Sequence, residues 1–245
     1  MNRQNPFAYR CNQCGRCCRN QSITLSPVDV IAIARATGLS TSEAVARYTM
    51  RRGSLLRFQA NGECVARDGV RCTIHRGRPL ACRLYPLGLE RDGTQERFAR
   101  LEPATGSAGI YGDAGNIGEF LAAQGVNQRL ILNEHYRPLI SMMRDRVASV
   151  TDFETVEPRE FWRRAVAEAL RETNFDSNRL IDAIFGADGD GCYRESIRAT
   201  VEVHASALAE IARGETDGAE LAVAAVLLAV SLGYSPEEAI VNGTA

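Results

Sequence analysis

The chain has 245 residues, of which 45% are hydrophobic and 24% are charged, and its formal net charge is -1 at pH 7. These proportions are typical of a globular protein with enough apolar side chains to bury a core. A charge so close to zero argues against a generally basic protein that binds nucleic acid or a membrane surface.

The two ends of the chain contain no segment that would direct it to or through a membrane. The first ten residues lack the apolar stretch of a secretory signal. The apolar run 221–232 is shorter than the roughly 20 residues that a helix needs to span a bilayer. We therefore expect a cytoplasmic protein, and in that reducing compartment clustered thiols serve as metal ligands or redox groups more often than as disulfides.

Residues 1–20 contain four closely spaced cysteines and are expected to have little regular structure. Two helices are then predicted. The first begins with Ser26 as the N-cap, Pro27 in the first turn and Asp29 against the helix dipole, and it ends at Gly38. The second covers residues 41–53. Because these helices separate the first cysteines from the later ones, we expect them to fold beside the site and bring its halves together.

From residue 55 to residue 101 the pattern changes to short extended pieces. Segments 55–58, 63–66 and 71–75 are strand-like, and they are separated by Asn61-Gly62 and Asp68-Gly69, which suit tight hairpin turns. Residues 78–86 form a turn or a short helix bounded by two prolines. Segments 84–89 and 96–101 are predicted to pair across Asp92-Gly93.

Residues 103–118 are unusual because a glycine stands at every third position from 106 to 118. Without the proline content of collagen this repeat does not predict a triple helix. It predicts a loop whose backbone can pass close to something bulky. A metal cluster, an anionic ligand or a tightly packed turn would each fit.

Beyond residue 116 the chain has helical spacing almost to its end. The predicted helices are 117–124, 127–148, 158–172, 176–185, 193–213, 217–232 and 236–242. We therefore expect a mainly α protein in which an irregular, cysteine-rich metal-binding unit with short β-hairpins packs against a helical C-terminal half. The two parts are predicted to be residues 1–105 and residues 106–245.

The cysteines are the strongest chemical signal in the chain. Seven of the eight are Cys11, Cys14, Cys17, Cys18, Cys64, Cys72 and Cys82, and several thiolates can converge on zinc, Cu(I) or an iron–sulfur cluster. The C-x2-C-x2-C spacing of the first three resembles the run of bacterial ferredoxins, in which a fourth cysteine comes from elsewhere. Here Cys64, Cys72 or Cys82 would supply it. The spacing favours an iron–sulfur cluster, of which 4Fe-4S is the expected type, over zinc.

Cys18 complicates this interpretation, because two adjacent cysteines do not easily face the same metal. Seven thiols also exceed the four that one zinc ion or one cubane cluster needs. Two nearby centres would use the surplus, and His75 is a possible nitrogen ligand, although a hydrogen-bonding role fits it slightly better. Cys192 stands alone and is expected to be a buried or an indifferent thiol.

The combination of these cysteines with Cys72-Thr-Ile-His75, Arg78-Pro79 and Cys82-Arg-Leu-Tyr85-Pro resembles the CxxCxxCC family of YkgJ-like proteins. The resemblance covers about residues 9–90, and it implies a domain that chelates zinc or iron. Flagellin lysine-N-methylase is similar in carrying a cysteine unit of this type. Within the motif we expect Arg78, Arg83 and Tyr85 to contact the bound cofactor or to tune it.

The sequence therefore predicts a metal-binding protein that holds an iron–sulfur or multinuclear iron centre and has a redox or metal-dependent modification role. An iron–sulfur oxidoreductase and a protein-modifying enzyme are both compatible with it, and no catalytic residue can be named. The substrate would be a protein or a small molecule. One alternative is a structural zinc module in an interaction protein. Another, by analogy with the methylase, is methylation of a protein lysine.

Overall fold

The computed structural model describes residues 1–12, 14–92, 95–171, 178–188 and 196–240. Its helices are α1 (Pro27–Thr37), α2 (Thr41–Tyr48), α3 (Leu80–Leu84), α4 (Ile117–Ala123), α5 (Val126–Asn133), α6 (Arg137–Val150), α7 (Pro158–Ala169), α8 (Arg179–Phe185), α9 (Ile197–Arg213), α10 (Gly218–Ser231) and α11 (Pro236–Ile240). The strands are β1 (Pro6–Arg10), β2 (Thr49–Met50), β3 (Leu55–Leu56), β4 (Arg67–Asp68), β5 (Arg71–Cys72), β6 (Leu87–Asp92), β7 (Gln95–Arg100) and β8 (Ile110–Asn116). Short 3-10 turns lie at Arg16–Cys18, Arg51–Gly53 and His75–Gly77.

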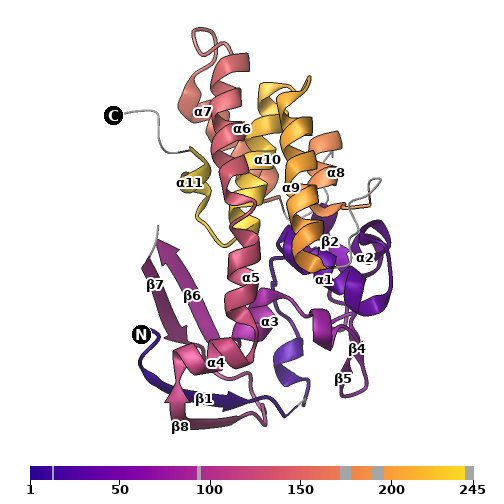
Figure 1. Ribbon diagram of the computed structural model, residues 1–245, viewed down its shortest axis with the longest axis vertical. Coiled ribbons are helices and arrows are strands. Elements are labelled where there is room, and N and C mark those ends of the chain that lie inside the picture. Colours follow the sequence, from indigo (N-terminus) through magenta and orange to yellow (C-terminus); the bar gives the residue numbers. More distant parts are fainter. Residues whose placement is uncertain (13, 93–94, 172–177, 189–195, 241–245) are drawn as a thin grey trace.

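The predicted fold class is confirmed: the described chain is mainly helical, and its strands form small antiparallel pairs. Helices α6, α7, α8, α9 and α10 stand together at one end of the molecule (Figure 1), and α10 contacts α6, α7, α8 and α11. The strand pairs and the cysteine-rich segments lie at the other end. No helix in the described ranges is both long enough and apolar enough to cross a membrane.

One large core joins the two ends of the molecule. It runs from Leu25, Val28 and Ile31, at the start of α1 and within it, to the buried faces of α6, α8, α9 and α10. Helix α1 contacts α5, α8 and α9, so the helical half packs directly on the element that follows the first cysteines. A second, smaller core lies between β1, β6, β7, α3, α4 and α5, and it includes Phe7, Leu84 and Phe120.

Helix α1 begins as local chemistry predicts. The Ser26 hydroxyl accepts a hydrogen bond from the Asp29 N–H at 3.2 Å, and the Asp29 carboxylate accepts one from the Ser26 N–H at 3.1 Å, which completes a capping box. The helix ends at Gly38 in the left-handed conformation, with φ of 70°. Helix α2 has the same kind of box, formed by Ser40 and Glu43.

The structure corrects several predicted boundaries. Helix α2 ends at Tyr48, before the predicted residue 53, because Thr49–Met50 leaves the helix to pair with Leu55–Leu56. Segment 63–66 forms only isolated bridges and no strand. The hairpin is formed instead by the residues that follow, in which β4 pairs with β5. The predicted pairing of the next two segments is present in β6 and β7, with Leu87 opposite Arg100, but the first strand begins at Leu87 and not at 84, because Leu84 belongs to α3. The predicted turn residue Gly93 lies outside the described residues.

The largest correction concerns the first residues and the glycine-rich segment. Residues 6–10 are not irregular and residues 110–116 are not a loop, because β1 and β8 form an antiparallel pair with Tyr9 opposite Tyr111. The pair lies at the base of the molecule in Figure 1. The division into 1–105 and 106–245 stays a prediction, and this strand pair crosses it.

The predicted helix 127–148 is in fact two helices, α5 and α6, which are separated at 134–136. Pro138, in the first turn of α6, accounts for the break, because proline has no N–H to continue a preceding helix. The first residues predicted for the helices 176–185 and 193–213 lie outside the described residues.

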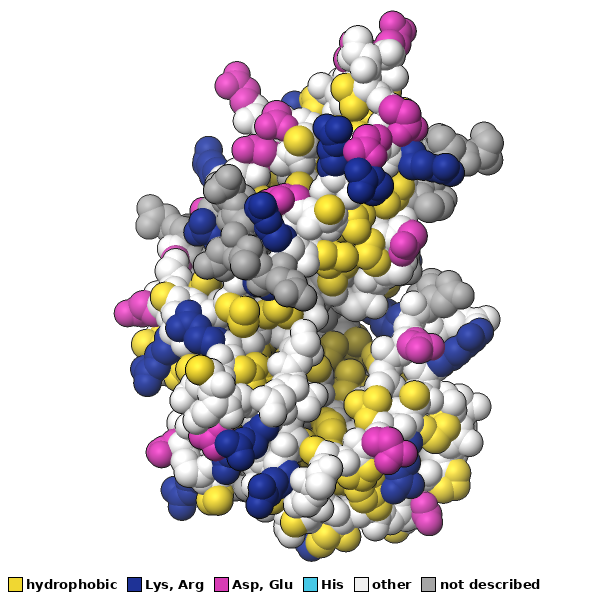
Figure 2. Space-filling view, turned by 180° about the vertical axis from the view of Figure 1, so that it is seen from behind, with side chains coloured by type: hydrophobic (Ala, Val, Ile, Leu, Met, Phe, Trp, Pro, Cys, Tyr) yellow, Lys and Arg dark blue, Asp and Glu magenta, His cyan; other side chains and the backbone are white. Residues whose placement is uncertain are grey.

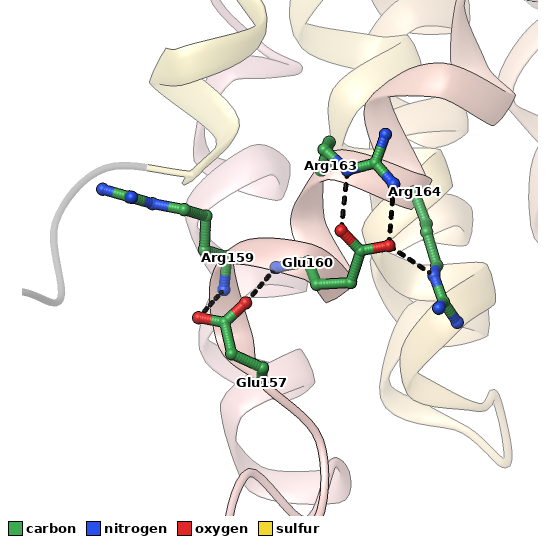
Figure 3. A network of polar contacts seen from close by, with 5 residues as sticks. All are labelled: Glu157, Arg159, Glu160, Arg163 and Arg164. Carbon is green, nitrogen blue, oxygen red and sulfur yellow. Dashed lines mark hydrogen bonds and ion pairs between the residues drawn. The ribbon is translucent and has the colours of Figure 1, made fainter.

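Charged side chains are distributed over the surface rather than gathered in one region. In Figure 2, Arg and acidic side chains alternate over the face shown, and apolar side chains gather in a hollow midway along it. At the start of α7 the Glu157 carboxylate caps the helix by accepting from the N–H groups of Arg159 and Glu160 (Figure 3). Glu160 in turn pairs with Arg163 and Arg164, at 2.7 and 2.9 Å.

Candidate metal centre

The first cysteine segment leaves β1 at Arg10 and turns tightly at Gly15. Gly15 has a φ of 71°, in the left-handed region, and the Cys18 N–H donates to its carbonyl at 3.2 Å. The guanidinium of Arg67 lies over Gly15, so that a Cβ there would be 2.7 Å from Arg67 Nε. The backbone conformation therefore favours glycine at this position, and a larger residue would also displace the Arg67 guanidinium.

Backbone pairing brings Cys64 beside Cys18. The Cys64 N–H donates to the Cys18 carbonyl at 3.2 Å, and the Asn20 N–H donates to the Gly62 carbonyl at 2.9 Å. Ion pairs from Glu63 to Arg19 and to Arg67, at 3.2 and 3.0 Å, reinforce this contact. The long insertion between the first and second cysteine groups therefore closes on itself, as the sequence predicted.

The β4–β5 hairpin carries Cys72 to the same place. Cys72 stands opposite Arg67, and the Arg67 N–H donates to the Cys64 carbonyl at 3.0 Å. Cys64 is buried in the large core, and Cys18 and Cys72 are partly buried and pack against that core. Three of the predicted ligands thus lie on one supporting surface.

Cys82 reaches the group from helix α3, which is fastened by buried polar contacts. The Asp29 carboxylate, 2% exposed, accepts a hydrogen bond from the N–H of Leu80, the first residue of α3, at 3.0 Å. Arg83 donates to the carbonyls of Arg78, Gln124 and Arg76 at 3.0, 2.7 and 2.7 Å. The turn between the two prolines is therefore the short helix that the sequence allowed.

The seven thiols form one continuous neighbourhood in which each influences the ionisation of another. Burial raises the pKa of Cys82, and the nearby thiols of Cys18, Cys64 and Cys72 raise it further. Burial likewise raises the pKa of Cys64 to about 11. These shifts follow from removing thiolates from water and placing like charges side by side.

The thiols of Cys17 and Cys18 share a hydrogen bond that shifts their pKa values in opposite directions. This bond and burial raise the pKa of the Cys17 thiol, and the charges of Cys18, Cys11 and Cys14 add to the effect. The same bond lowers the pKa of Cys18, with help from the Arg67 guanidinium. Within the described residues, no three His, Cys, Asp or Glu side chains are already arranged to hold a metal ion. The thiols are neighbours that do not yet converge on one point.

The glycine-rich segment passes close to the first cysteines. The Ala108 N–H donates to Cys14 Sγ at 3.4 Å. This bond and one from the Arg16 N–H lower the pKa of Cys14. One residue further on, a Cβ at Gly109 would lie 2.2 Å from Tyr9 Oη. The close approach that the glycine pattern predicted is therefore present, and a cysteine and a tyrosine are the groups approached.

The three predicted cofactor-contacting residues lie at the rim of the thiol neighbourhood. Arg78 donates to the His75 carbonyl at 3.0 Å and to Gln124 Oε1 at 2.6 Å. Tyr85 Oη accepts from the Ala104 N–H at 3.3 Å, which ties it to the start of the glycine-rich segment. These bonds, like those of Arg83, fasten the chain around the thiols, and direct contact with a cofactor stays a prediction.

His75 lies next to Arg78, whose Nη1 is 3.2 Å from His75 Nε2. Burial lowers the pKa of His75, and the charges of Arg78 and Arg83 lower it further, so the ring is held neutral. A neutral imidazole suits either a ligand or a hydrogen-bonding role, so both predicted roles remain open. Cys192 lies outside the described residues.

Sequence reasoning missed the buried groups that hold the site from the helical side. Asp29 was predicted as a first-turn acid and not as the anchor of α3. Arg129, 7% exposed on α5, donates to the Val28 carbonyl at 3.0 Å and places its charge beside Asp29. The local sequence carries no sign of these contacts, because they join segments 50 to 100 residues apart.

Residues 10–103 match the model of the CxxCxxCC family, which is described as a "putative zinc- or iron-chelating domain". Neither the curated proteins nor the solved structures gave a match. The matched segment contains all seven clustered thiols together with α1, the β4–β5 hairpin and α3. The segment that holds the seven clustered thiols is therefore similar to a domain described as chelating zinc or iron.

Proposed function

We propose that this domain holds an iron–sulfur or multinuclear iron centre through Cys11, Cys14, Cys17, Cys18, Cys64, Cys72 and Cys82. The observation that supports this most directly is that backbone pairing and the Asp29 carboxylate fasten the cysteine-bearing segments at 18, 64, 72 and 82 to one another. Thiolates are the ligands that soft and borderline metals prefer, so the donor set fits iron–sulfur chemistry and zinc. The number of thiols exceeds what a single zinc ion uses, which favours a cluster or several ions.

Positive charge beside three of the thiols also supports metal binding. Arg67 acts on Cys18, Arg78 on Cys72 and Arg83 on Cys82. Each guanidinium favours the thiolate form, which is the form that binds a metal.

The charge of Arg83 is also poorly solvated. Burial lowers the pKa of Arg83 to about 10, and the charges of Arg129 and Arg78 lower it further. A centre made of several thiolates carries net negative charge and would stabilise the neighbouring positive charges of these arginines.

When bound, an iron–sulfur centre would supply electron transfer or Lewis-acid chemistry. The N–H donors at Cys14 would tune its potential, because hydrogen bonds to cluster sulfurs do so in general. The role we assign is redox chemistry or metal-dependent modification of a protein or small-molecule substrate. No observation on the described residues favours lysine methylation, and it is not part of the proposal.

The test is anaerobic purification followed by iron, zinc and acid-labile sulfide analysis, with an absorption spectrum. We expect a brown protein that contains iron and sulfide and loses part or all of both in Cys82→Ser. The matched control is Cys192→Ser, which removes the one cysteine outside the cluster and should leave the metal content unchanged. A colourless protein with stoichiometric zinc would show a structural zinc module instead. A Cys82→Ser protein with full metal content and an unchanged spectrum would refute the ligand assignment.

A further inference from the structure

Strand β8 is an exposed edge strand at the base of the molecule. Within the described part of the chain its sheet contains only β1 and β8, and most of the residues of β8 are exposed. The strand forms the lower margin of the molecule in Figure 1. Alternate residues of an antiparallel strand direct their backbone groups away from the partner strand. β8 therefore presents N–H and C=O groups with which another extended chain can pair.

The regular part of this edge is short. The pairing of β8 with β1 is regular from Ile110 to Gly112, and its register shifts before Asn116. An irregularity of this kind bends a strand, so a further strand would be confined to the first residues of β8 and the turn before them. Residues 104–109, which form that turn, are exposed or half-exposed. We call residues 106–112 the docking segment.

Two exposed arginines of the first cysteine region flank the docking segment. Arg10 stands opposite Ile110 in the strand pair. At the other end of the segment, Arg16 Nε lies 3.8 Å from the position that a Cβ of Gly106 would occupy. Neither guanidinium forms an ion pair with a carboxylate of the described residues.

A third exposed arginine, Arg100, is held over the same segment by aromatic side chains. Its Cζ lies 4.2 Å from the centre of the Tyr111 ring, and that ring packs on Tyr9 with the two centroids 4.9 Å apart. Arg100 also has no ion pair within the ranges that the structure describes. Three guanidiniums from three segments thus surround the docking segment, and each is available to a carboxylate from outside.

The docking segment also adjoins the candidate metal centre. The Ala108 N–H donates to Cys14 Sγ at 3.4 Å. Arg10 directly precedes Cys11, whose side chain is exposed. A chain bound along the docking segment would therefore pass the exposed side of the cysteine cluster.

We propose that the docking segment binds an extended, acidic segment of a partner protein, held by backbone pairing with β8 and by ion pairs with Arg10, Arg16 and Arg100. An added strand gains affinity from main-chain hydrogen bonds, and unpaired positive charge selects an acidic sequence. That the bound segment is a substrate of the metal centre rests on the proposed function, whereas its binding does not.

The charge of the whole chain agrees with an acidic partner at this end, although both signs are spread over the surface. Residues 1–105 contain 17 arginines and 8 acidic residues, whereas residues 106–245 contain 12 arginines and 22 acidic residues. The first part would attract a negatively charged segment and the second would repel it. A nucleic acid fits less well, because it has no peptide backbone to pair with a strand edge.

The test is fluorescence anisotropy of the full chain, as purified, with a fluorescein-labelled octapeptide in which Thr and Glu alternate. Two control peptides carry either Gln in place of Glu or methyl groups on the backbone nitrogens. We expect each control to bind roughly tenfold more weakly or worse, and binding of the Thr–Glu peptide to weaken as salt is added. No binding of the Thr–Glu peptide, equal binding of either control, or tighter binding of an oligothymidylate of the same length would overturn the inference.

The triple variant Arg10→Gln/Arg16→Gln/Arg100→Gln should bind the Thr–Glu peptide about tenfold more weakly, because three exposed ion pairs are lost. Its matched control is Arg159→Gln, which removes an exposed arginine of α7 and should leave binding unchanged. The peptide controls use the wild type, so a folding defect in the variant does not weaken the test. Peptide binding by a protein without metal would refute the proposed function alone, and metal-loaded protein that does not bind the peptide would refute this inference alone.

Discussion

Asp29 provides the sharpest test of how the helices hold the metal-binding unit. Its carboxylate accepts one hydrogen bond from the Ser26 N–H at the start of α1 and another from the Leu80 N–H at the start of α3. Cys82 follows two residues after Leu80. We predict that Asp29→Asn destabilises the fold and also reduces metal retention, because the tether of the Cys82 helix is weakened.

The expected magnitude follows from these two bonds. An amide keeps one acceptor oxygen but presents an NH₂ group to the other backbone N–H, so one charge-assisted hydrogen bond, typically about 1.5–3 kcal/mol, is lost. The charge beside Arg129 is lost as well. Burial raises the pKa of Asp29 against the opposing effects of Arg129 and the two N–H groups, so the neutral amide recovers part of this loss. The net cost is about 2 kcal/mol, which corresponds to a decrease of about 4–8 °C in Tm for a protein of this size.

Glu43→Gln is the matched control for Asp29→Asn. Glu43 occupies the same place in the capping box of α2, where it accepts from the Ser40 N–H at 2.8 Å, but it is exposed to solvent, whereas Asp29 is buried between two helices. Thermal unfolding and metal analysis of both variants isolate the tether to α3. Equal decreases in Tm, or an unchanged metal content in folded Asp29→Asn, would refute the reasoning.

Two further predictions concern the helical half. His204 lies between two partners, because its Nε2–H donates to the Ala183 carbonyl and its Nδ1 accepts from Tyr136, both at 2.8 Å. Burial lowers the pKa of His204. The free energy of unfolding should therefore fall as the pH decreases from about 6.5 towards the pKa of His204 in the folded state, because only the unfolded state takes up the proton there. Urea unfolding at pH 7.5 and 5.5 measures this, and the free energy of unfolding of His204→Gln should change less between these pH values than that of the wild type, in which His75 and His204 both contribute. Burial raises the pKa of Asp188, but the hydrogen bonds from Thr41 and Ser42 at the start of α2 outweigh it, so the pKa is lowered overall. The stability that the Asp188 carboxylate contributes is therefore present above about pH 4 and is lost as the pH falls through its pKa in the folded state. Asp188→Asn should cost about 1 kcal/mol at pH 7 after allowance for solvent screening, and a variant as stable as the wild type at pH 7 would contradict this capping role.

The parts of the fold that could be predicted are those decided by neighbouring residues. The start and end of α1 follow from Ser26, Pro27 and Gly38, because a cap, a preset φ and a left-handed residue each act within one turn. The β6–β7 hairpin follows from a short turn between two extended runs. Pro138 also indicates the break between α5 and α6, but the helical spacing of the residues on both sides led to the prediction of one continuous helix.

The missed elements depend on contacts between distant residues. Strand β8 contains Gly112 and Gly115, which have low strand propensity, and it is stabilised by pairing with β1 about 100 residues earlier. Cysteine spacing indicated metal chemistry correctly, since the ligand type is a property of the residue. It could not show which thiols share a surface, because the pairing of residues 18–20 with 62–64 and the tether from Asp29 decide that.

The same contacts explain why a metal-binding unit carries so large a helical body. Cys64 is supported by a core shared with α6, α8, α9 and α10, and the α3 helix that presents Cys82 is held by Asp29 of α1 and by the Gln124 carbonyl at the end of α4. Helix α5 adds Arg129, which binds the Val28 carbonyl of α1 and so fixes the helix that bears Asp29. Thiols on short hairpins and one-turn helices have little rigidity of their own. The helices therefore act on the site by supporting Cys18, Cys64 and Cys72 from the large core and by fastening the helix that bears Cys82, whereas Cys11 and Cys14 lie beside β1 and the turn before β8.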